Sequence, residues 1–143
     1  MAKKTDDAQQ LKSAGAVLVT TPQDVALADV IRAKQMFDKL AVPVLGIVEN
    51  MSQFICPHCG KGTHIFDTGG GRKASDMMDI TFFGEIPLQL SIRQGGDKGL
   101  PVVVGHPDGA EGTAFMELAK KVAQRISVEN ASRTAPSVTI QSA

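Results

Sequence analysis

The chain of 143 residues contains no tryptophan, no tyrosine and only two cysteines. Without tryptophan or tyrosine it lacks the usual aromatic platforms on which single-stranded nucleic acid stacks. Lysine and arginine total 15 and match 15 acidic residues, so no basic surplus indicates a nucleic-acid or anionic-membrane partner. No apolar run approaches the ~20 residues that span a bilayer, and residues 1–10 are too polar for a secretory signal. We therefore expect a cytoplasmic protein with no nucleic-acid partner and no membrane partner.

The two cysteines, Cys56 and Cys59, enclose Pro57 and His58 and are followed by Gly60. This Cys-x-x-Cys spacing places both sulfurs on one side of a tight turn, which suits metal binding. Zinc and iron–sulfur sites usually take four ligands, often all of them thiolates, so half of such a site is present. Spacing and composition do not distinguish iron from zinc, because both metals take tetrathiolate sites.

Two thiol-only alternatives fit the cysteine pair less well. A thioredoxin-like redox pair opens a helix, whereas Gly60, Gly62 and Thr63 are poor helix starters. A structural disulfide across so short a loop would be strained, and nothing else in the chain indicates an oxidising compartment. We therefore favour a metal site over both.

The hydrophobic pattern predicts one α/β domain over residues 14–128. Apolar runs at 16–20 and 44–48 predict buried parallel strands, and the helical spacing between them predicts a crossover helix that ends near Leu40. Thr21 to Asp24 is similar to a capping box that starts this helix. Residues 51–71 predict a long functional loop that carries the cysteines.

The rest of the pattern continues this strand and helix alternation. The remaining expectations are a flexible lead at 1–13, a helix at 72–79, a strand at 80–86, a helix at 88–94 broken by Gly95 and Gly96, an extended stretch at 101–104, an amphipathic helix at 110–128 and a disordered tail at 129–143.

Five segments, read together, resemble the Mrp (ApbC) iron–sulfur cluster carriers, which are MinD/ParA-related P-loop ATPases. The segments are 15–27, 46–51, 56–59, 84–88 and 99–103. Their joint occurrence in the right order, from Gly15 to Ile126, is far more specific than any one of them. The resemblance implies a partial doubly wound, mostly parallel sheet that corresponds to the C-terminal half of a MinD/ParA-like P-loop NTPase.

The resemblance also implies a cofactor, partners and site residues. It implies a homodimer in which Cys56 and Cys59 of two chains hold one shared 4Fe-4S cluster, which is passed to apo iron–sulfur client proteins. It implies an ATP (Mg) site in which Asn50 faces the adenine and Pro87 lines the base pocket. The amide of Asn50 suits adenine because it offers both a donor and an acceptor, although a strand-end asparagine can equally cap a turn.

The chain departs from the family at the phosphate site. The motif Gly-x-x-x-x-Gly-Lys-Ser/Thr does not occur, and the glycine-rich stretch 69–73 fails its spacing, so we expect no hydrolysis by this chain alone and a simple turn there. A sheet that lacks its first half would expose strand edges and depend on a partner for stability.

Two alternatives to the carrier interpretation stay open. One is a zinc-stabilised structural domain with no cluster trafficking, in which His58 and His64 or a second subunit complete the site. The other is an active ATPase whose missing residues come from another polypeptide.

Overall fold

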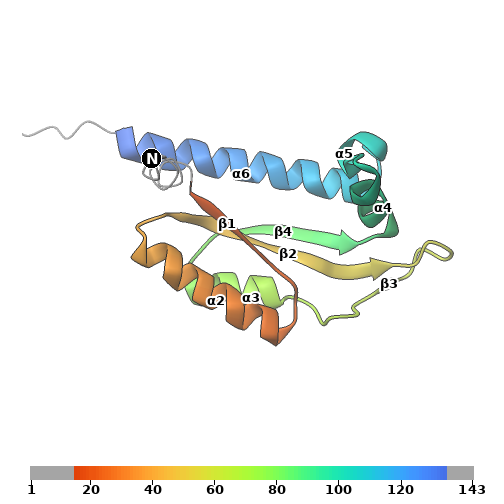
Figure 1. Ribbon diagram of the computed structural model, residues 1–143, viewed down its shortest axis with the longest axis horizontal. Coiled ribbons are helices and arrows are strands. Elements are labelled where there is room, and N and C mark those ends of the chain that lie inside the picture. The colour runs from red at the N-terminus through yellow and green to blue at the C-terminus, as the bar shows by residue number, and fades with distance from the viewer. Residues whose placement is uncertain (1–14, 135–143) are drawn as a thin grey trace, which may run out of the picture.

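The computed structural model describes residues 15–134, which form a mostly parallel sheet with helices on both faces (Figure 1). Its elements are β1 (Ala16–Thr20), α2 (Asp24–Lys39), β2 (Val44–Ile55), β3 (Gly62–Thr63), α3 (Gly70–Met78), β4 (Phe82–Leu88), α4 (Leu90–Lys98), α5 (Val102–Gly105) and α6 (Ala110–Thr134). The predicted α/β class is confirmed. The expected lead at 1–13 and residues 135–143 of the expected tail lie outside the described residues.

Strand β2 is the centre of the sheet. It pairs in parallel with β1 on one edge and with β4 on the other, so that Ile47 lies opposite Leu18 and Asn50 lies opposite Ile86. The short β3 pairs antiparallel with the far end of β2, where Phe54 lies opposite Thr63. Both crossovers, through α2 and through α3, connect parallel strands, as the expected strand–helix–strand units require.

Each face of the sheet is covered by its own hydrophobic core. Helices α2 and α3 lie on one face and α6 lies on the other (Figure 1). The first core is built on the buried residues Leu18, Val30, Ile47 and Ala74. The second is built on Leu45, Val48, Phe83 and Ile86, against which Phe115, Leu118, Val122 and Ile126 of α6 pack. Burial on both faces explains why the strands read as continuous apolar runs rather than as alternating ones.

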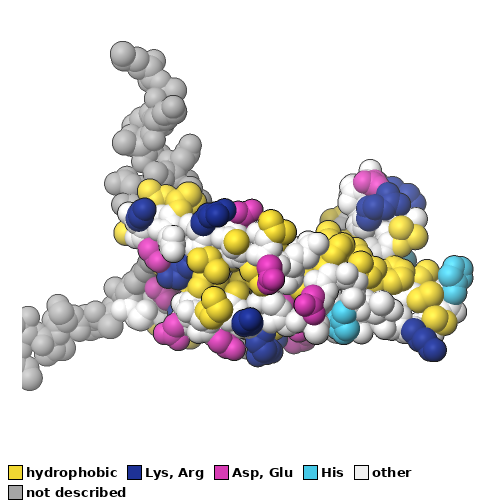
Figure 2. Space-filling view, turned by 90° about the horizontal axis from the view of Figure 1, so that it is seen from below, with side chains coloured by type: hydrophobic (Ala, Val, Ile, Leu, Met, Phe, Trp, Pro, Cys, Tyr) yellow, Lys and Arg dark blue, Asp and Glu magenta, His cyan; other side chains and the backbone are white. Residues whose placement is uncertain are grey.

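The outer edge of β1 is open in the part of the chain that the structure describes, because no strand there pairs with it. Val19 is 59% exposed on this edge. A hollow of about 550 Å³ runs between β1 and α2, and another of about 320 Å³ lies between the sheet and α6. Figure 2 shows the face that α2 and α3 cover, where hydrophobic side chains lie between charged groups. Among residues 15–134, no helix combines the length and the hydrophobicity needed to cross a bilayer.

Several predicted boundaries are wrong. Strand β2 continues to Ile55, so the first part of the expected 51–71 loop is strand, and α6 continues to Thr134, so residues 129–134 of the expected tail are helical. The expected extended stretch at 101–104 contains the short helix α5, whose turn is closed by the carbonyl of Pro101. Helix α2 begins at Asp24 without a capping box, because the Thr21 hydroxyl contacts the side chain of Gln23.

Gly95 and Gly96 do not break α4, which contains both of them. The chain folds back over this helix, and the amide of Leu100 donates a hydrogen bond to the carbonyl of Gly95 at 2.9 Å. A Cβ atom on Gly95 would stand 2.5 Å from the carbonyl oxygen of Leu100. The glycine is therefore required by this close approach.

We predict that Ile47→Ala lowers the free energy of unfolding by about 2–5 kcal/mol, because it leaves a cavity in the central strand. Ile47 is fully buried at 0% exposure, whereas the control position Val25 in the first turn of α2 is 72% exposed. Urea denaturation of both alanine variants followed by circular dichroism measures the difference. Equal midpoints for Ile47→Ala and Val25→Ala would contradict this account of the core.

Candidate functional site

The cysteines lie in a closed turn at the end of β2, which projects beyond the helices (Figure 1). The amide of Cys56 donates to the carbonyl of Lys61 at 3.0 Å, and the amide of Gly60 donates to the carbonyl of Cys56 at 2.9 Å. Gly60 has φ 68°, a left-handed conformation that glycine adopts without strain. The pairing of Gly62 with Ile55 closes the base of the turn. The turn predicted from the spacing is thus held by its own backbone hydrogen bonds.

Both thiols are free and accessible to a ligand. Cys56 is half-buried and Cys59 is exposed. Hydrogen bonds from the backbone amide of His58, then from the backbone and side chain of Cys59, lower the pKa of Cys56 below that of an ordinary thiol. A thiol must lose its proton to bind a metal, so this backbone arrangement favours the ligand form.

The histidines do not complete a metal site within one chain. Nδ1 of His64 lies 3.0 Å from the carbonyl oxygen of Ser52, so its ring is turned toward β2. Over residues 15–134, no three or more histidine, cysteine, aspartate or glutamate side chains come together in an arrangement that could hold a metal ion. The described part of one chain therefore supplies two thiolate ligands, and further ligands have to come from outside it.

Asn50 and Pro87, the predicted nucleotide contacts, occupy neighbouring positions in the sheet. Asn50 is the first residue beyond the stretch of β2 that pairs with β1, and Pro87 directly follows its β4 partner, Ile86. The amide of Met51, which has φ 57°, donates to Oδ1 of Asn50 at 2.9 Å. The side-chain oxygen of Asn50 therefore accepts a hydrogen bond from the next residue, as in the turn-capping alternative. The same side chain also lines both hollows beside β1. Contact with a nucleotide stays a prediction.

Glu49 is a buried polar group of the site region. Its side chain is 0% exposed and accepts hydrogen bonds from the amides of Gly69 at 3.3 Å and Gly71 at 2.6 Å. The sequence signal for it is an acidic residue inside an apolar strand, followed 20 positions later by three consecutive glycines. The glycine-rich stretch is therefore bound to a carboxylate of the same chain.

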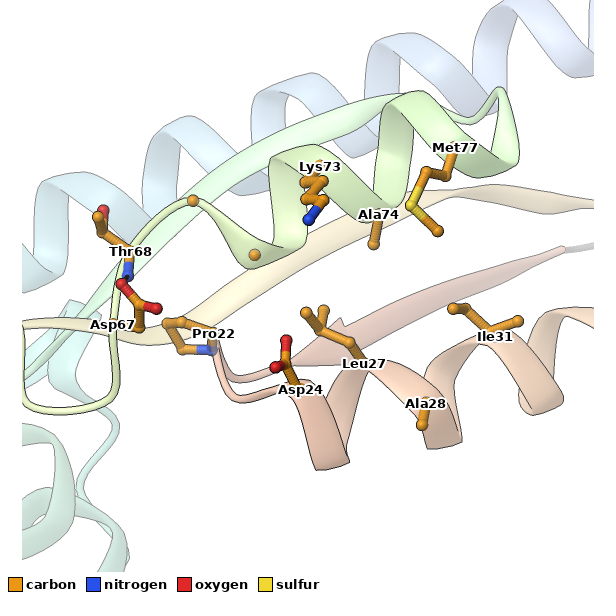
Figure 3. A pocket seen from close by; sticks show the side chains of 12 residues that line it. Pro22, Asp24, Leu27, Ala28, Ile31, Asp67, Thr68, Lys73, Ala74 and Met77 are labelled. Carbon is orange, nitrogen blue, oxygen red and sulfur yellow. Dashed lines mark hydrogen bonds between the residues drawn. The ribbon is translucent and has the colours of Figure 1, made fainter.

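A separate pocket of about 340 Å³ lies between α2 and α3 (Figure 3). Leu27, Ile31 and Met77 form its apolar wall, and Asp67 and Lys73 lie at its polar end. Neither cysteine nor Asn50 lines this pocket, and we assign it no part in the site.

The chain matches the model of one protein family, described as ParA, NUBPL iron-transfer P-loop NTPase, over residues 4–123. It is 52% identical over 114 residues to a protein of Arabidopsis thaliana named "Iron-sulfur protein required for NADH dehydrogenase, mitochondrial", covering 80% of this chain and 36% of the relative. It is 46% identical to the mouse "Iron-sulfur cluster transfer protein NUBPL" (82% and 37% covered) and 44% identical to the Escherichia coli "Iron-sulfur cluster carrier protein" (83% and 32% covered).

Solved structures superpose on the chain as well. The MinD cell division ATPase of Pyrococcus furiosus superposes with a TM-score of 0.63 at 26% identity, covering 78% of this chain and 43% of that one. A nucleotide-binding protein of Archaeoglobus fulgidus, solved in complex with ADP, superposes with a TM-score of 0.53 at 40% identity (60% and 35% covered). The chain spans about a third of the length of the curated relatives it matches.

We predict that Cys56 reacts with iodoacetamide at lower pH than an ordinary thiol, whose pKa is about 8.5. A lowered pKa leaves more thiolate at any pH below that value, and the rate falls only as the pH drops through the lowered pKa. The pH profile of alkylation, resolved from that of Cys59 by mass-spectrometric fragmentation, measures the midpoint.

The substitution His58→Pro removes the backbone N–H that contributes most to this shift, so it moves the midpoint to higher pH. The matched control His58→Ala removes the imidazole but keeps the N–H, and its midpoint stays near that of the unmodified chain. Identical midpoints for the proline and alanine variants would contradict the assignment of the shift to the backbone.

Proposed function

Because the chain belongs to the ParA family of NUBPL-type iron-transfer P-loop NTPases, we propose that it binds an iron–sulfur cluster through Cys56 and Cys59 and passes it to apo iron–sulfur proteins. The observation that carries the proposal is the closed turn at the end of β2, which presents two free thiols at the surface. Relatives named as iron–sulfur cluster carrier and transfer proteins match the chain across this turn.

Two thiolates per chain favour a dimer as the cluster-binding unit. A 4Fe-4S cluster takes four cysteine ligands, and the sequence holds only two. No histidine or carboxylate joins the two thiols among the described residues. We propose that Cys56 and Cys59 of two copies share one 4Fe-4S cluster across the dimer interface.

The position of the turn supports delivery of the cluster as cargo. Transfer requires that thiolates of the client protein replace the four cysteine ligands in turn. Cys59 is exposed in the single chain, so the turn needs no local unfolding to receive or to release a cluster. The lowered pKa of Cys56 raises its thiolate fraction above that of an ordinary thiol, which favours uptake of a new cluster after release.

The nucleotide site is proposed as a half-site. Asn50 would bind the adenine edge and Pro87 would line the base pocket, both at the carboxyl ends of parallel strands, where ligands bind in sheets of this class. The sequence lacks a phosphate-binding loop, so phosphate and magnesium contacts would come from another polypeptide segment. We propose no ATP hydrolysis by these residues alone. The cytoplasmic location stays a prediction.

We predict that anaerobic reconstitution with iron and sulfide gives a brown dimer with about four irons and four sulfides per two chains. Cys56→Ala should abolish the colour and the cluster-dependent dimer, whereas His106→Ala should retain both, because His106 lies at the end of α5 among residues of α4 and α5. Visible absorbance, iron and sulfide assays and size-exclusion chromatography make the measurement. Colourless protein with stoichiometric zinc would contradict the carrier proposal and support the zinc-stabilised structural domain instead.

We also predict that adenosine and ATP perturb the same NMR signals, those of the Asn50 side-chain amide and of residues beside Pro87. The two ligands should behave alike because the chain offers no phosphate loop. Asn50→Ala should abolish the perturbation, and Gln53→Ala, a nearby amide on β2, serves as the control. Absence of any shift with adenosine at millimolar concentration would reject the half-site.

A further inference from the structure

Glu49 is a fully buried carboxylate on the central strand β2. It is one of the three largest fully buried side chains, together with Ile47 and Phe83. None of the ion pairs among residues 15–134 includes it, and its partners are the amides of Gly69 and Gly71. A buried carboxylate is unfavourable unless it is hydrogen-bonded, and two amides at the start of a helix stabilise it through charge-assisted bonds and the helix dipole. The contact is therefore a strong one for both groups.

This contact closes a longer hairpin that contains the cysteine turn. Beyond Glu49, β2 runs to Ile55 and enters the cysteine turn, and the chain then comes back along β2 as residues 62–71, the return segment. Three contacts fasten the return segment to β2. They are the pairing of β3 with β2, the contact of His64 Nδ1 with the Ser52 carbonyl at 3.0 Å, and the two amides on Glu49. Glu49 is the contact farthest along the chain from the turn, and the only charged one of the three.

The glycines of the return segment permit the close approach. A Cβ atom on Gly71 would lie 2.9 Å from Cβ of Glu49, and a Cβ atom on Gly70 would lie 2.5 Å from the carbonyl oxygen of Pro22. Gly69 has φ 74°, in the left-handed region, and serves as the N-cap of α3. The three glycines thus seat the start of α3 against the carboxylate and against the turn that precedes α2. The amides of Gly69 and Gly71 are bound to Glu49, so this pair is not free to bind a phosphate.

We propose that Glu49 is a positioning residue for Cys56 and Cys59, an inference that rests on the proposed function. It holds the return segment in place and so limits the conformations of the cysteine turn before a ligand arrives. Side chains that hold a metal-binding group in place typically change metal affinity by roughly 10–100-fold when replaced. Because Glu49 acts through a hairpin rather than by touching a ligand, we expect a weakening of roughly 10-fold, at the lower end of that range.

The test is an anaerobic titration with Co²⁺, which reports thiolate ligation through its visible absorption. Glu49→Gln keeps the shape of the side chain but has one acceptor oxygen and places an NH₂ group against a backbone amide. We expect it to bind Co²⁺ roughly 10-fold more weakly than the unmodified chain, with the same spectrum at saturation, because the ligands are unchanged. Hydrogen exchange of residues 62–71 should accelerate at the same time.

Glu85→Gln is the matched control. Glu85 lies directly opposite Glu49 on β4, but it is exposed and makes no hydrogen bond or ion pair within the described residues. It should leave both the cobalt affinity and the hydrogen exchange unchanged. A purely structural role of Glu49 would lower the melting temperature of Glu49→Gln but leave its cobalt affinity equal to that of the control, and that result would overturn the proposal.

Two further outcomes distinguish failure of this proposal from failure of the proposed function. If Glu49→Gln does not fold, Glu49→Asp takes its place. This variant keeps the charge but is too short to reach both amides. A cobalt affinity of Glu49→Asp equal to that of the unmodified chain would then overturn the proposal. If the unmodified chain itself fails to bind Co²⁺ while folded, the thiolate site of the proposed function fails, and the role of Glu49 fails with it.

Discussion

The parallel pairing of β2 on both of its edges is the constraint on which the rest of the structure depends. It fixes which side chains of β2 enter each core and buries Ile47 and Glu49 completely. The same strand continues past the end of β1 to carry Asn50 and then the cysteine turn. One continuous element thus connects the hydrophobic core, the predicted adenine contact and the thiols. The position of each is set by register rather than by a flexible linker.

The parts of the fold that could be predicted are those whose signal is local. The strand at 16–20 and the helix after it are bounded by Thr21-Pro22 and Pro43, and both lie close to their predicted positions. The second half of β2 was missed because its polar residues do not read as a buried strand, and its register shifts between Asn50 and Phe54. Gly95 reads as a helix break because glycine has a low helix propensity, whereas the close approach of Leu100 that requires a glycine there depends on how the chain turns after the helix.

In the candidate site, too, the sequence predicts the features with a local signal and misses the others. The spacing of Cys56 and Cys59 predicted a tight turn, and the structure places them in one. The three consecutive glycines indicate a close approach of the backbone, but they do not indicate that their amides bind Glu49, which lies 20 and 22 positions away. The sequence contains only two cysteines, so a second pair of thiolates would come from another chain. The proposal of a shared cluster therefore depends on the family and on the number of ligands that a cluster takes.

Exposure of Cys59 in the single chain has a consequence for how long the thiols of the proposed cluster site stay reduced. An accessible thiolate is open to oxidants such as peroxide, which convert it to sulfenic acid. A cluster site built on such thiols would suit rapid hand-over of its cargo rather than storage in an aerobic environment.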